Sequence, residues 1–218
     1  MNILPITNNN QINISKQQNF KAGKIVIKNP EIFPADALEE FAKNSEIKKL
    51  AQELSKRGMD LLAEYVKTNS EDFDAIVMTV DHHPINHCSF TYNGGMWPTH
   101  CVQHSIGAAI YDPLLKNAYN TKKKVFTLTK GDINTVEEYS IMDNHHSSKE
   151  LLRIIEKEGI EEINVCGIMS RFCVLESIKG LVKSGHKDKI NVLLDFIAHD
   201  DNNEELIAYC NENGIKIN

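Results

Sequence analysis

Short apolar runs alternate along this chain with amphipathic stretches, and this alternation limits the possible folds more than any other feature. Four runs are rich in Val, Ile and Leu and are bounded by polar residues or glycine, namely 75–80, 124–128, 163–168 and 190–196. They predict buried strands. Residues 24–28 and 213–217 predict weaker or edge strands, and residues 1–7 are a further candidate in which Pro5 favours an edge or an irregular end.

Amphipathic helical patterns lie between these runs. Apolar residues recur at helical spacing over 47–65 and over 174–182. A third pattern, 147–158, opens on Ser147 with Glu150 three residues later, which predicts a helix capped by Ser147. Strands and helices in alternation predict an α/β domain with a largely parallel sheet, in which functional residues gather at the carboxyl ends of the strands.

Composition excludes several classes of protein. Lys and Arg number 24 and Asp and Glu number 30 among 218 residues, so the net charge is −6. Nucleic-acid binding or a polybasic membrane anchor needs a basic face, and neither is expected here. No apolar run approaches the roughly 18 residues of a membrane-spanning helix, and a secretory signal is not expected from the first residues. Five scattered cysteines fit reduced thiols in a cytoplasmic protein.

Histidines and an aspartate gather just after the run 75–80. Asp81 and His83 are two residues apart in extended chain and therefore point the same way. His100, which follows Trp97, offers a third ligand. One carboxylate and two imidazoles suit an accessible divalent metal such as zinc, manganese or iron. Surface or capping histidines are the plainer interpretation, but four histidines at 82, 83, 87 and 100, of nine in the chain, favour the metal.

Two further reactive side chains follow predicted strands. Lys130 comes directly after 124–128, where a cation can stabilise charge or act in catalysis, and a solvated surface lysine is the alternative. Cys173 lies where the run 163–168 gives way to a helix. Unpaired N–H groups and the helix dipole lower the pKa of a thiol at such a position, favour the thiolate and can hold an oxyanion. A buried structural cysteine is the other interpretation of Cys173.

The order of these motifs resembles the nicotinamidase/pyrazinamidase branch of the isochorismatase-like cysteine hydrolases. The matching stretches, which span about residues 75–200, are Asp81-x-His83-Pro84 with His87-x-Ser89-Phe90, Trp97-Pro-x-His100-Cys101-Val102-Gln103, Lys130-Gly131 with Glu138-Tyr139-Ser140, and Cys173-Val174. The stretch around His100 is specific to the nicotinamidase branch. The resemblance implies a single-domain, Rossmann-like three-layer sandwich over 1–218, with a mainly parallel six-stranded sheet and a divergent N-terminal region at 1–70.

The resemblance also implies an activity. Members of this branch hydrolyse nicotinamide to nicotinate and ammonia through a cysteine thioester, and pyrazinamide is an expected analogue. Cys173 matches the nucleophile and Lys130 matches the cation beside it. The backbone N–H groups of Met169 and Cys173 match the oxyanion hole, and the Ile168–Met169 peptide matches the family's cis linkage.

Further matches concern the metal and the substrate. Asp81, His83 and His100 match the ligands of one divalent ion, zinc foremost, and Ser89 matches a weaker position of the metal shell. Trp97 matches an aromatic wall of the pocket. The resemblance suggests a small-molecule substrate and assembly into a homo-oligomer, with no nucleic-acid or membrane partner.

This sequence departs from the family at the N-terminal strand. The family carries a catalytic Asp there, the general base, in a D-x-Q-N-D-F-like stretch. The nearest counterpart here runs from Asn9 to Ile14, with Asn9 at the Asp position and Ile14 at the position of an aromatic pocket residue. Asparagine cannot accept a proton at neutral pH, and general-base help is typically worth about 10²–10⁴ in rate.

Three explanations of this departure stay open. The chain is a family member with weakened or lost amidase activity, which acts on another small amide or only binds a ligand. Alternatively, a carboxylate from elsewhere, such as Asp132 or Glu138, takes the place of the missing base. In the third explanation Asn9 is tolerated, because Lys130 and the start of the helix already form the thiolate.

Overall fold

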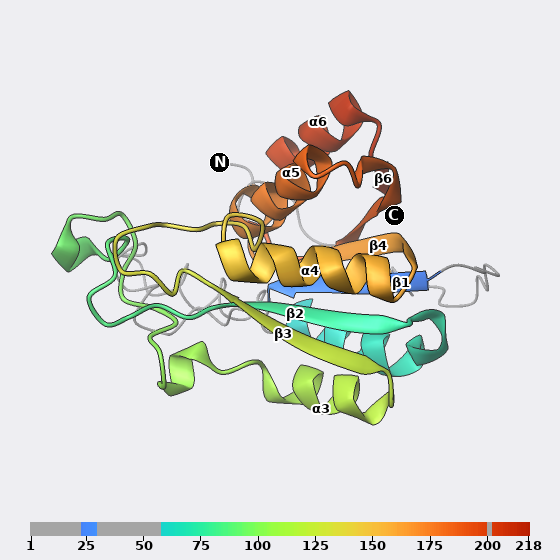
Figure 1. Ribbon diagram of the computed structural model, residues 1–218, viewed down its shortest axis with the longest axis horizontal. Helices are drawn as coiled ribbons and strands as arrows, with labels where there is room; N and C mark the ends of the chain where they lie inside the picture. Colours follow the sequence, from blue (N-terminus) through green and yellow to red (C-terminus); the bar gives the residue numbers. More distant parts are fainter. Residues whose placement is uncertain (1–22, 30–57, 200–201) are drawn as a thin grey trace, which may run out of the picture.

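The computed structural model describes residues 23–29, 58–199 and 202–218. Within them, six strands form one sheet in the order β3-β2-β1-β4-β5-β6, and every neighbouring pair is parallel (Figure 1). The strands are β1 (Gly23–Asn29), β2 (Ala75–Asp81), β3 (Lys124–Lys130), β4 (Ile160–Gly167), β5 (Ile190–Ile197) and β6 (Lys216–Ile217). The predicted α/β class with a parallel sheet is confirmed.

Helices cover both faces of the sheet (Figure 1). On one face lie α4 (His145–Lys157), α5 (Leu175–Lys183) and α6 (Glu204–Asn213), and on the other lie α3 (Asp112–Asn120) and a helix seen over 58–68. Short 3-10 turns occupy Ser70–Asp72, Thr91–Asn93, Ile106–Ala108 and Lys187–Lys189, and a π-helical segment, η4, occupies Ser170–Val174. No helix in the described part of the chain is both long and apolar enough to cross a bilayer.

The strand order reverses between β1 and β4. From β1 the chain builds outward to β2 and β3, then crosses back to β4 and builds outward again to β5 and β6. Right-handed crossovers place the helices of the two halves on opposite faces. In open α/β sheets, ligands bind outside the carboxyl ends of the strands at such a reversal.

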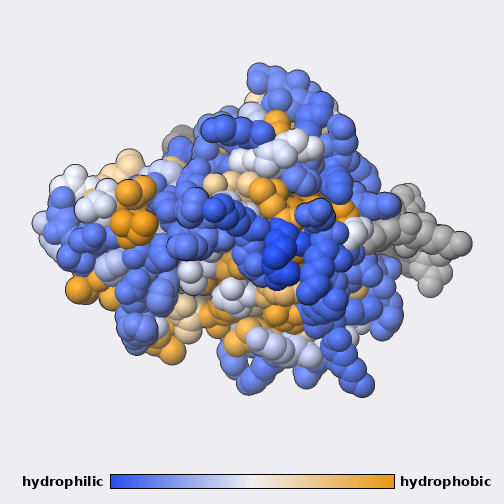
Figure 2. Space-filling model, in the orientation of Figure 1, coloured by the Kyte–Doolittle hydropathy of each residue, from blue (hydrophilic) through white to orange (hydrophobic). Residues whose placement is uncertain are grey.

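The core explains why the strands read as continuous apolar runs. All seven residues of β2 are buried, because helices cover that strand on both sides. Leu151 and Ile154 of α4 and Ile178 and Leu181 of α5 belong to the same buried cluster. Burial of each such side chain contributes about 1.5–3 kcal/mol. The face of the molecule seen in Figure 2 is mostly hydrophilic, with apolar residues visible between the hydrophilic ones.

The position expected for the strand at 24–28 is wrong. β1 pairs with β2 on one side and with β4 on the other, so it is central and not an edge strand. Lysines at 24 and 28 give its sequence the look of an exposed strand. The other weak candidate, 213–217, does form the edge strand β6, but only over Lys216–Ile217, because α6 continues to Asn213.

The cap predicted for α4 is also wrong. The helix begins two residues earlier, and the side-chain oxygen of Asn144 accepts from the backbone N–H groups of His146 (3.1 Å) and Ser147 (3.0 Å). The Ser147 hydroxyl instead donates to the carbonyl of Thr129 at 2.7 Å. The strand candidate 1–7, most of the helical pattern 47–65, and both Asn9 and Ile14 lie outside the described residues.

Candidate active site and metal centre

Three predicted metal ligands converge beyond the carboxyl end of β2. Asp81 is the last residue of that strand, His83 follows two residues later, and His100 comes from the loop that returns beside them. One donor atom from each lies within 4.8 Å of the other two. Asp81 and His83 are buried and His100 is half-buried. Such a carboxylate–imidazole set can hold a divalent ion.

Both imidazoles are oriented by a backbone carbonyl. His83 Nδ1 lies 2.9 Å from the Gly131 carbonyl, and His100 Nδ1 lies 2.8 Å from the Pro98 carbonyl. The other nitrogen of His83, Nε2, is buried and has no hydrogen-bond partner among the described residues. Metal-binding histidines typically donate one N–H in this way while the second nitrogen serves as ligand. Burial lowers the pKa of His100 to about 4, which keeps the ring in its neutral, ligating form.

Gly131 allows His83 to reach this carbonyl. A Cβ atom at position 131 would lie 2.3 Å from Cε1 of His83, and the backbone there has a φ of +64°. Any side chain would therefore displace the ligand. This is a physical reason for glycine in the Lys130-Gly131 motif.

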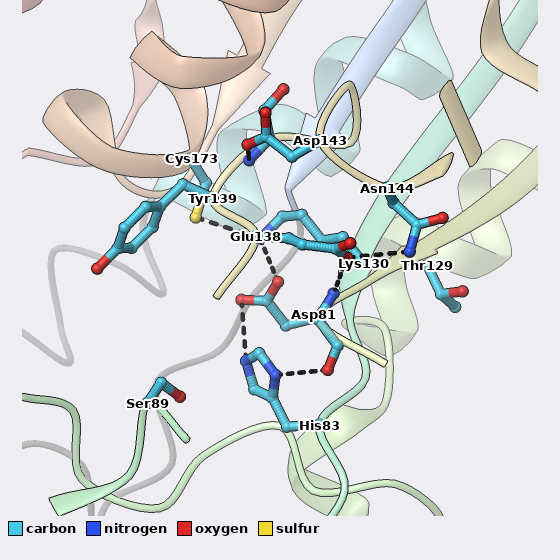
Figure 3. A network of polar contacts seen from close by, with 12 residues as sticks. Asp81, His83, Ser89, Thr129, Lys130, Glu138, Tyr139, Asp143, Asn144 and Cys173 are labelled. Atoms are coloured by element: carbon cyan, nitrogen blue, oxygen red, sulfur yellow. Dashed lines mark hydrogen bonds and ion pairs between the residues drawn. The ribbon is translucent and has the colours of Figure 1, made fainter. Parts of the chain in front are cut away.

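Lys130 connects the metal ligands to the predicted nucleophile. It ends β3 as the register partner of Asp81. Its Nζ forms an ion pair with the Asp81 carboxylate and lies 3.4 Å from Sγ of Cys173 (Figure 3). Lys130 is 0% exposed. A charge so completely removed from water persists only when its partners are fixed around it, so the three groups form one unit.

Cys173 lies beyond the end of β4, inside η4 and directly before α5. The sequence predicts this position at a helix start, and the structure places it in a π-helical turn in which Phe172 has non-helical backbone angles. The Ile168–Met169 peptide is cis, as the resemblance implies. The backbone N–H of Ser170 donates to the Ala198 carbonyl at 3.0 Å, which ties the turn to the chain beyond β5.

Three aromatic side chains, those of Trp97, Tyr139 and Phe172, contact one another near His100. Phe172 directly precedes Cys173 in the sequence. Trp97 and Phe172 meet edge to face at 4.9 Å between ring centroids, and the indole N–H of Trp97 donates to the Tyr139 hydroxyl at 2.9 Å. The Trp97 ring also lies 6.3 Å from that of His100. The predicted wall residue Trp97 is thus one of three rings that can contact a flat guest.

Known proteins support the same assignment. No protein-family model matches the chain. The nicotinamidase of Saccharomyces cerevisiae is 24% identical over 173 residues, 67% of this chain and 78% of that protein. The nicotinamidase of Escherichia coli is 30% identical over 139 residues, 56% of this chain and 62% of that protein. The chain is therefore similar in sequence to nicotinamidases from a fungus and a bacterium. The structure of the pyrazinamidase of Pyrococcus horikoshii in complex with zinc has the same fold, with a TM-score of 0.68 at 23% identity, over 90% of this chain and 98% of that one.

One acidic residue near the candidate site was missed by sequence reasoning, namely Glu137. Burial raises the pKa of the Glu137 carboxyl, Asp81 raises it further, and His83 and a hydrogen bond with Ser89 act in the opposite direction. Its Oε2 is buried without a hydrogen-bond partner in the part of the chain that the structure describes. Glu137 directly precedes the matched stretch Glu138-Tyr139-Ser140, which was the available signal.

Ser89, expected in the metal shell, is held by a neighbouring histidine. Its Oγ lies 2.6 Å from Nδ1 of His87, whose Nε2 lies 3.0 Å from the Val136 carbonyl. His87 is fully buried, and its ring lies 4.2 Å from that of His83. His87 therefore packs behind the predicted ligands as a supporting residue.

The two carboxylates considered as substitute bases have other partners. The side-chain amide of Asn144 donates to Asp132 at 2.8 Å and to Glu138 at 2.9 Å, and the Glu138 carboxylate also accepts from the Gly131 backbone N–H at 2.7 Å. These bonds hold together the loop from Gly131 to the start of α4. Both acids thus serve the loop that carries the Gly131 carbonyl to His83.

Proposed function

We propose that this chain hydrolyses nicotinamide to nicotinate and ammonia through a thioester on Cys173. One observation carries the proposal, namely that Nζ of Lys130 contacts both Sγ of Cys173 and the carboxylate of Asp81. The thiol and the metal ligands are therefore one side chain apart, so a small aromatic amide can touch both. The relatives in yeast and in Escherichia coli are nicotinamidases.

In the proposed reaction, the Cys173 thiolate attacks the carboxamide carbon while the adjacent Lys130 ammonium stabilises the negative charge. The backbone N–H groups of Met169 and Cys173 are assigned to the oxyanion. The C–N bond then breaks, and the amide nitrogen takes a proton from a water molecule and leaves as ammonia. The hydroxide that remains attacks the thioester, the C–S bond breaks, and the thiolate is released together with the carboxylic acid, which ionises to the carboxylate.

Asp81, His83 and His100 are the residues that would hold one divalent ion, with zinc the first choice and manganese or iron the alternatives. The buried Nε2 of His83, which makes no hydrogen bond to the described residues and lies 3.7 Å from the Asp81 carboxylate, and the neutral ring of His100 fit that role. When bound, the ion supplies a Lewis acid for the ring nitrogen of the substrate. The rings of Trp97, Tyr139 and Phe172 form the apolar wall against which the substrate ring packs.

We infer that the position of the family's general base corresponds to the end of β1, because the resemblance puts that Asp on an N-terminal strand. This central strand ends at Asn29, whose register partner is Gly167, the last residue of the strand that leads to Cys173. Asn9 lies 14 residues before β1 begins at Gly23. We therefore assign Asn29, in place of Asn9, to the position of the family's catalytic Asp. Ile14 lies with Asn9 in the undescribed segment.

Other expected features remain proposals. Described strands from residue 23 to residue 217 join the same sheet, which supports one hydrolase domain over 1–218 with a divergent region at 1–70. A cytoplasmic location, assembly into a homo-oligomer and the absence of nucleic-acid and membrane partners complete the proposal.

The test is ammonia release from nicotinamide by the purified protein loaded with zinc. We expect release by the wild type, none by Cys173→Ala, and wild-type release by Cys166→Ala, which removes another buried thiol, one residue before the end of β4. Absence of release above the Cys173→Ala background would contradict the proposal, and release from a different small amide alone would favour the alternative substrate.

A companion pair tests the missing base. We expect Asn29→Asp to raise kcat, because it restores the carboxylate that the family carries on its N-terminal strand, and Asn9→Asp to leave it unchanged. A rise with Asn9→Asp alone would restore the original alignment of the N-terminal stretch.

A further inference from the structure

We infer that Cys101 and Gln103 position the metal ligands, by holding the chain at His83 against the loop that carries His100. This inference deepens the proposed function and rests on its metal site. The segment 101–103, called the clamp below, follows His100 directly in a motif whose last three residues have no role in the reaction described above.

The clamp replaces β3 as the partner of the chain beyond β2. Regular pairing with β3 reaches Asp81, and the backbone N–H of His82 still donates to the Lys130 carbonyl at 3.0 Å. At His83 the partner changes. The backbone N–H of His83 donates to the Cys101 carbonyl at 2.9 Å, and its carbonyl accepts from the Gln103 backbone N–H at 2.8 Å, as a short parallel bridge. His83 is therefore held on both sides by the residues next to His100.

The Gln103 side chain adds a third hydrogen bond, to the backbone between Asp81 and His83. Its amide N–H donates to the carbonyl of His82 at 2.9 Å. That carbonyl lies between the ligands Asp81 and His83, which point to one ion only while the chain between them stays extended. The bond therefore fixes the distance between Asp81 and His83. It also fixes the distance from this pair to His100.

Cys101 makes the corner that permits this arrangement. Its φ is +46°, in the left-handed region that residues other than glycine and asparagine rarely adopt, and its side chain is buried. The left-handed turn directs the carbonyl of Cys101 toward His83 immediately after His100. The hydroxyl and the backbone N–H of Ser105 both donate to the Val102 carbonyl, at 2.7 and 3.0 Å, and close the other end of the clamp.

The first experiment removes the Gln103 bond and measures metal directly. Gln103→Met keeps the length of the side chain and loses the N–H. We expect zinc affinity, measured by competition with a chromogenic chelator, to fall by about tenfold or more, in the range found for residues that orient metal ligands. We also expect the visible absorption spectrum of the Co²⁺-loaded protein to change, because ligand geometry sets that spectrum.

The matched control removes the same kind of bond far from the site. The side-chain amide of Asn117 in α3 donates to the Ala63 carbonyl at 2.8 Å. Asn117→Leu is expected to lower the stability of the metal-free protein about as much as Gln103→Met, with wild-type zinc affinity and Co²⁺ spectrum. A Gln103→Met protein that also keeps both wild-type values would overturn the inference.

A second pair of variants tests the left-handed turn at Cys101. This pair also tests the inference if Gln103→Met does not fold. Glycine adopts a φ of +46° freely, whereas valine, branched at Cβ, strongly disfavours it. Cys101→Gly is expected to keep wild-type zinc affinity and Cys101→Val to lose about tenfold. Equal affinities for the two would overturn the inference. A wild-type protein that binds no zinc would instead overturn the metal site of the proposed function.

Discussion

Strand β3 begins and ends with a lysine that pairs with a carboxylate, and the two pairs differ only in their surroundings. At the amino end, Lys124 meets Glu158 at 2.5 Å, with 59% of the lysine side chain and 12% of the glutamate side chain exposed. At the carboxyl end, Lys130 meets Asp81, with 1% and 5% exposed. The chemical groups are of the same kind, so contact with water is the main difference.

That difference separates a surface ion pair from a pair in the candidate active site. Exposed pairs contribute about 0–1 kcal/mol because water and salt screen them. A buried pair gives up hydration worth several kcal/mol per ion and can cost more than it returns. The Lys130–Asp81 pair also lies beside a thiol and two imidazoles, at the carboxyl ends of the strands. Buried charged side chains have an unfavourable desolvation energy, and a cluster of them at one edge of the sheet is typical of a functional site.

The largest expected effect comes from neutralising the two lysines in turn. We expect Lys130→Met to lower kcat/KM for nicotinamide by about 10²–10⁴ and the free energy of unfolding by about 3–5 kcal/mol, since Asp81 is left buried without its cation. Lys124→Met should change stability by less than about 1 kcal/mol and leave kcat/KM unchanged. Steady-state kinetics and urea unfolding check both. Similar effects at the two ends of β3 would break the comparison.

Metal removal tests the same edge of the sheet without a mutation. We expect dialysis against a chelator to lower kcat by about 10² or more, and added zinc to restore it. His100→Asn should show the same loss with poor recovery. His186→Asn, before the amino end of β5, is the matched control and should keep wild-type activity and metal content. Full activity in a protein shown by elemental analysis to be metal-free would contradict the assignment.

Two buried cysteines sharpen the comparison further. Burial raises the pKa of the Cys210 thiol to about 11, whereas Cys173 lies 3.4 Å from a buried ammonium. We expect iodoacetamide to alkylate Cys173 at pH 6.5 at least about tenfold faster than Cys210, as measured by mass spectrometry of digests. Lys130→Met should remove most of the difference. A midpoint for Cys173 near the value of about 8.5 for a free thiol would contradict it.

The part of this arrangement that depends on local periodicity could be predicted from the sequence. β2, β4 and β5 stand out as apolar runs because most of their residues are buried. β3 is an edge strand in which only Leu128 and Lys130 are buried, so the expectation of a buried strand there was wrong, although the strand itself was found. Asp81 and His83 are recognisable because spacing by two sets their direction in extended chain. Cys173 is recognisable because a strand there gives way to a helix.

The remainder depends on contacts between distant segments. The central place of β1 follows from pairing with two other strands, which its own residues do not encode. Asn144 outcompetes Ser147 as the cap of α4 because the Ser147 hydroxyl is bound to Thr129 in β3. The clamp and Glu137 become visible only when separate loops meet at the site.

The smallest expected effect concerns a buried histidine of the site and an exposed one in the same loop. The pKa of His100 in the folded, metal-free protein is about 4 because of burial, below the ordinary value of 6.5. The unfolded chain therefore takes up a proton first as the pH falls, so the stabilisation is complete above about pH 6.5 and is lost progressively toward pH 4. Between pH 7 and pH 5 the loss should be about 2 kcal/mol. Urea unfolding at pH 7 and at pH 5, without metal, measures this loss of unfolding free energy.

His100→Gln should flatten this pH dependence, and His104→Gln, at an exposed position in the same loop, should keep it. If the unfolding free energies of wild type and His100→Gln depended equally on pH, His100 would be no more desolvated than a histidine on the surface.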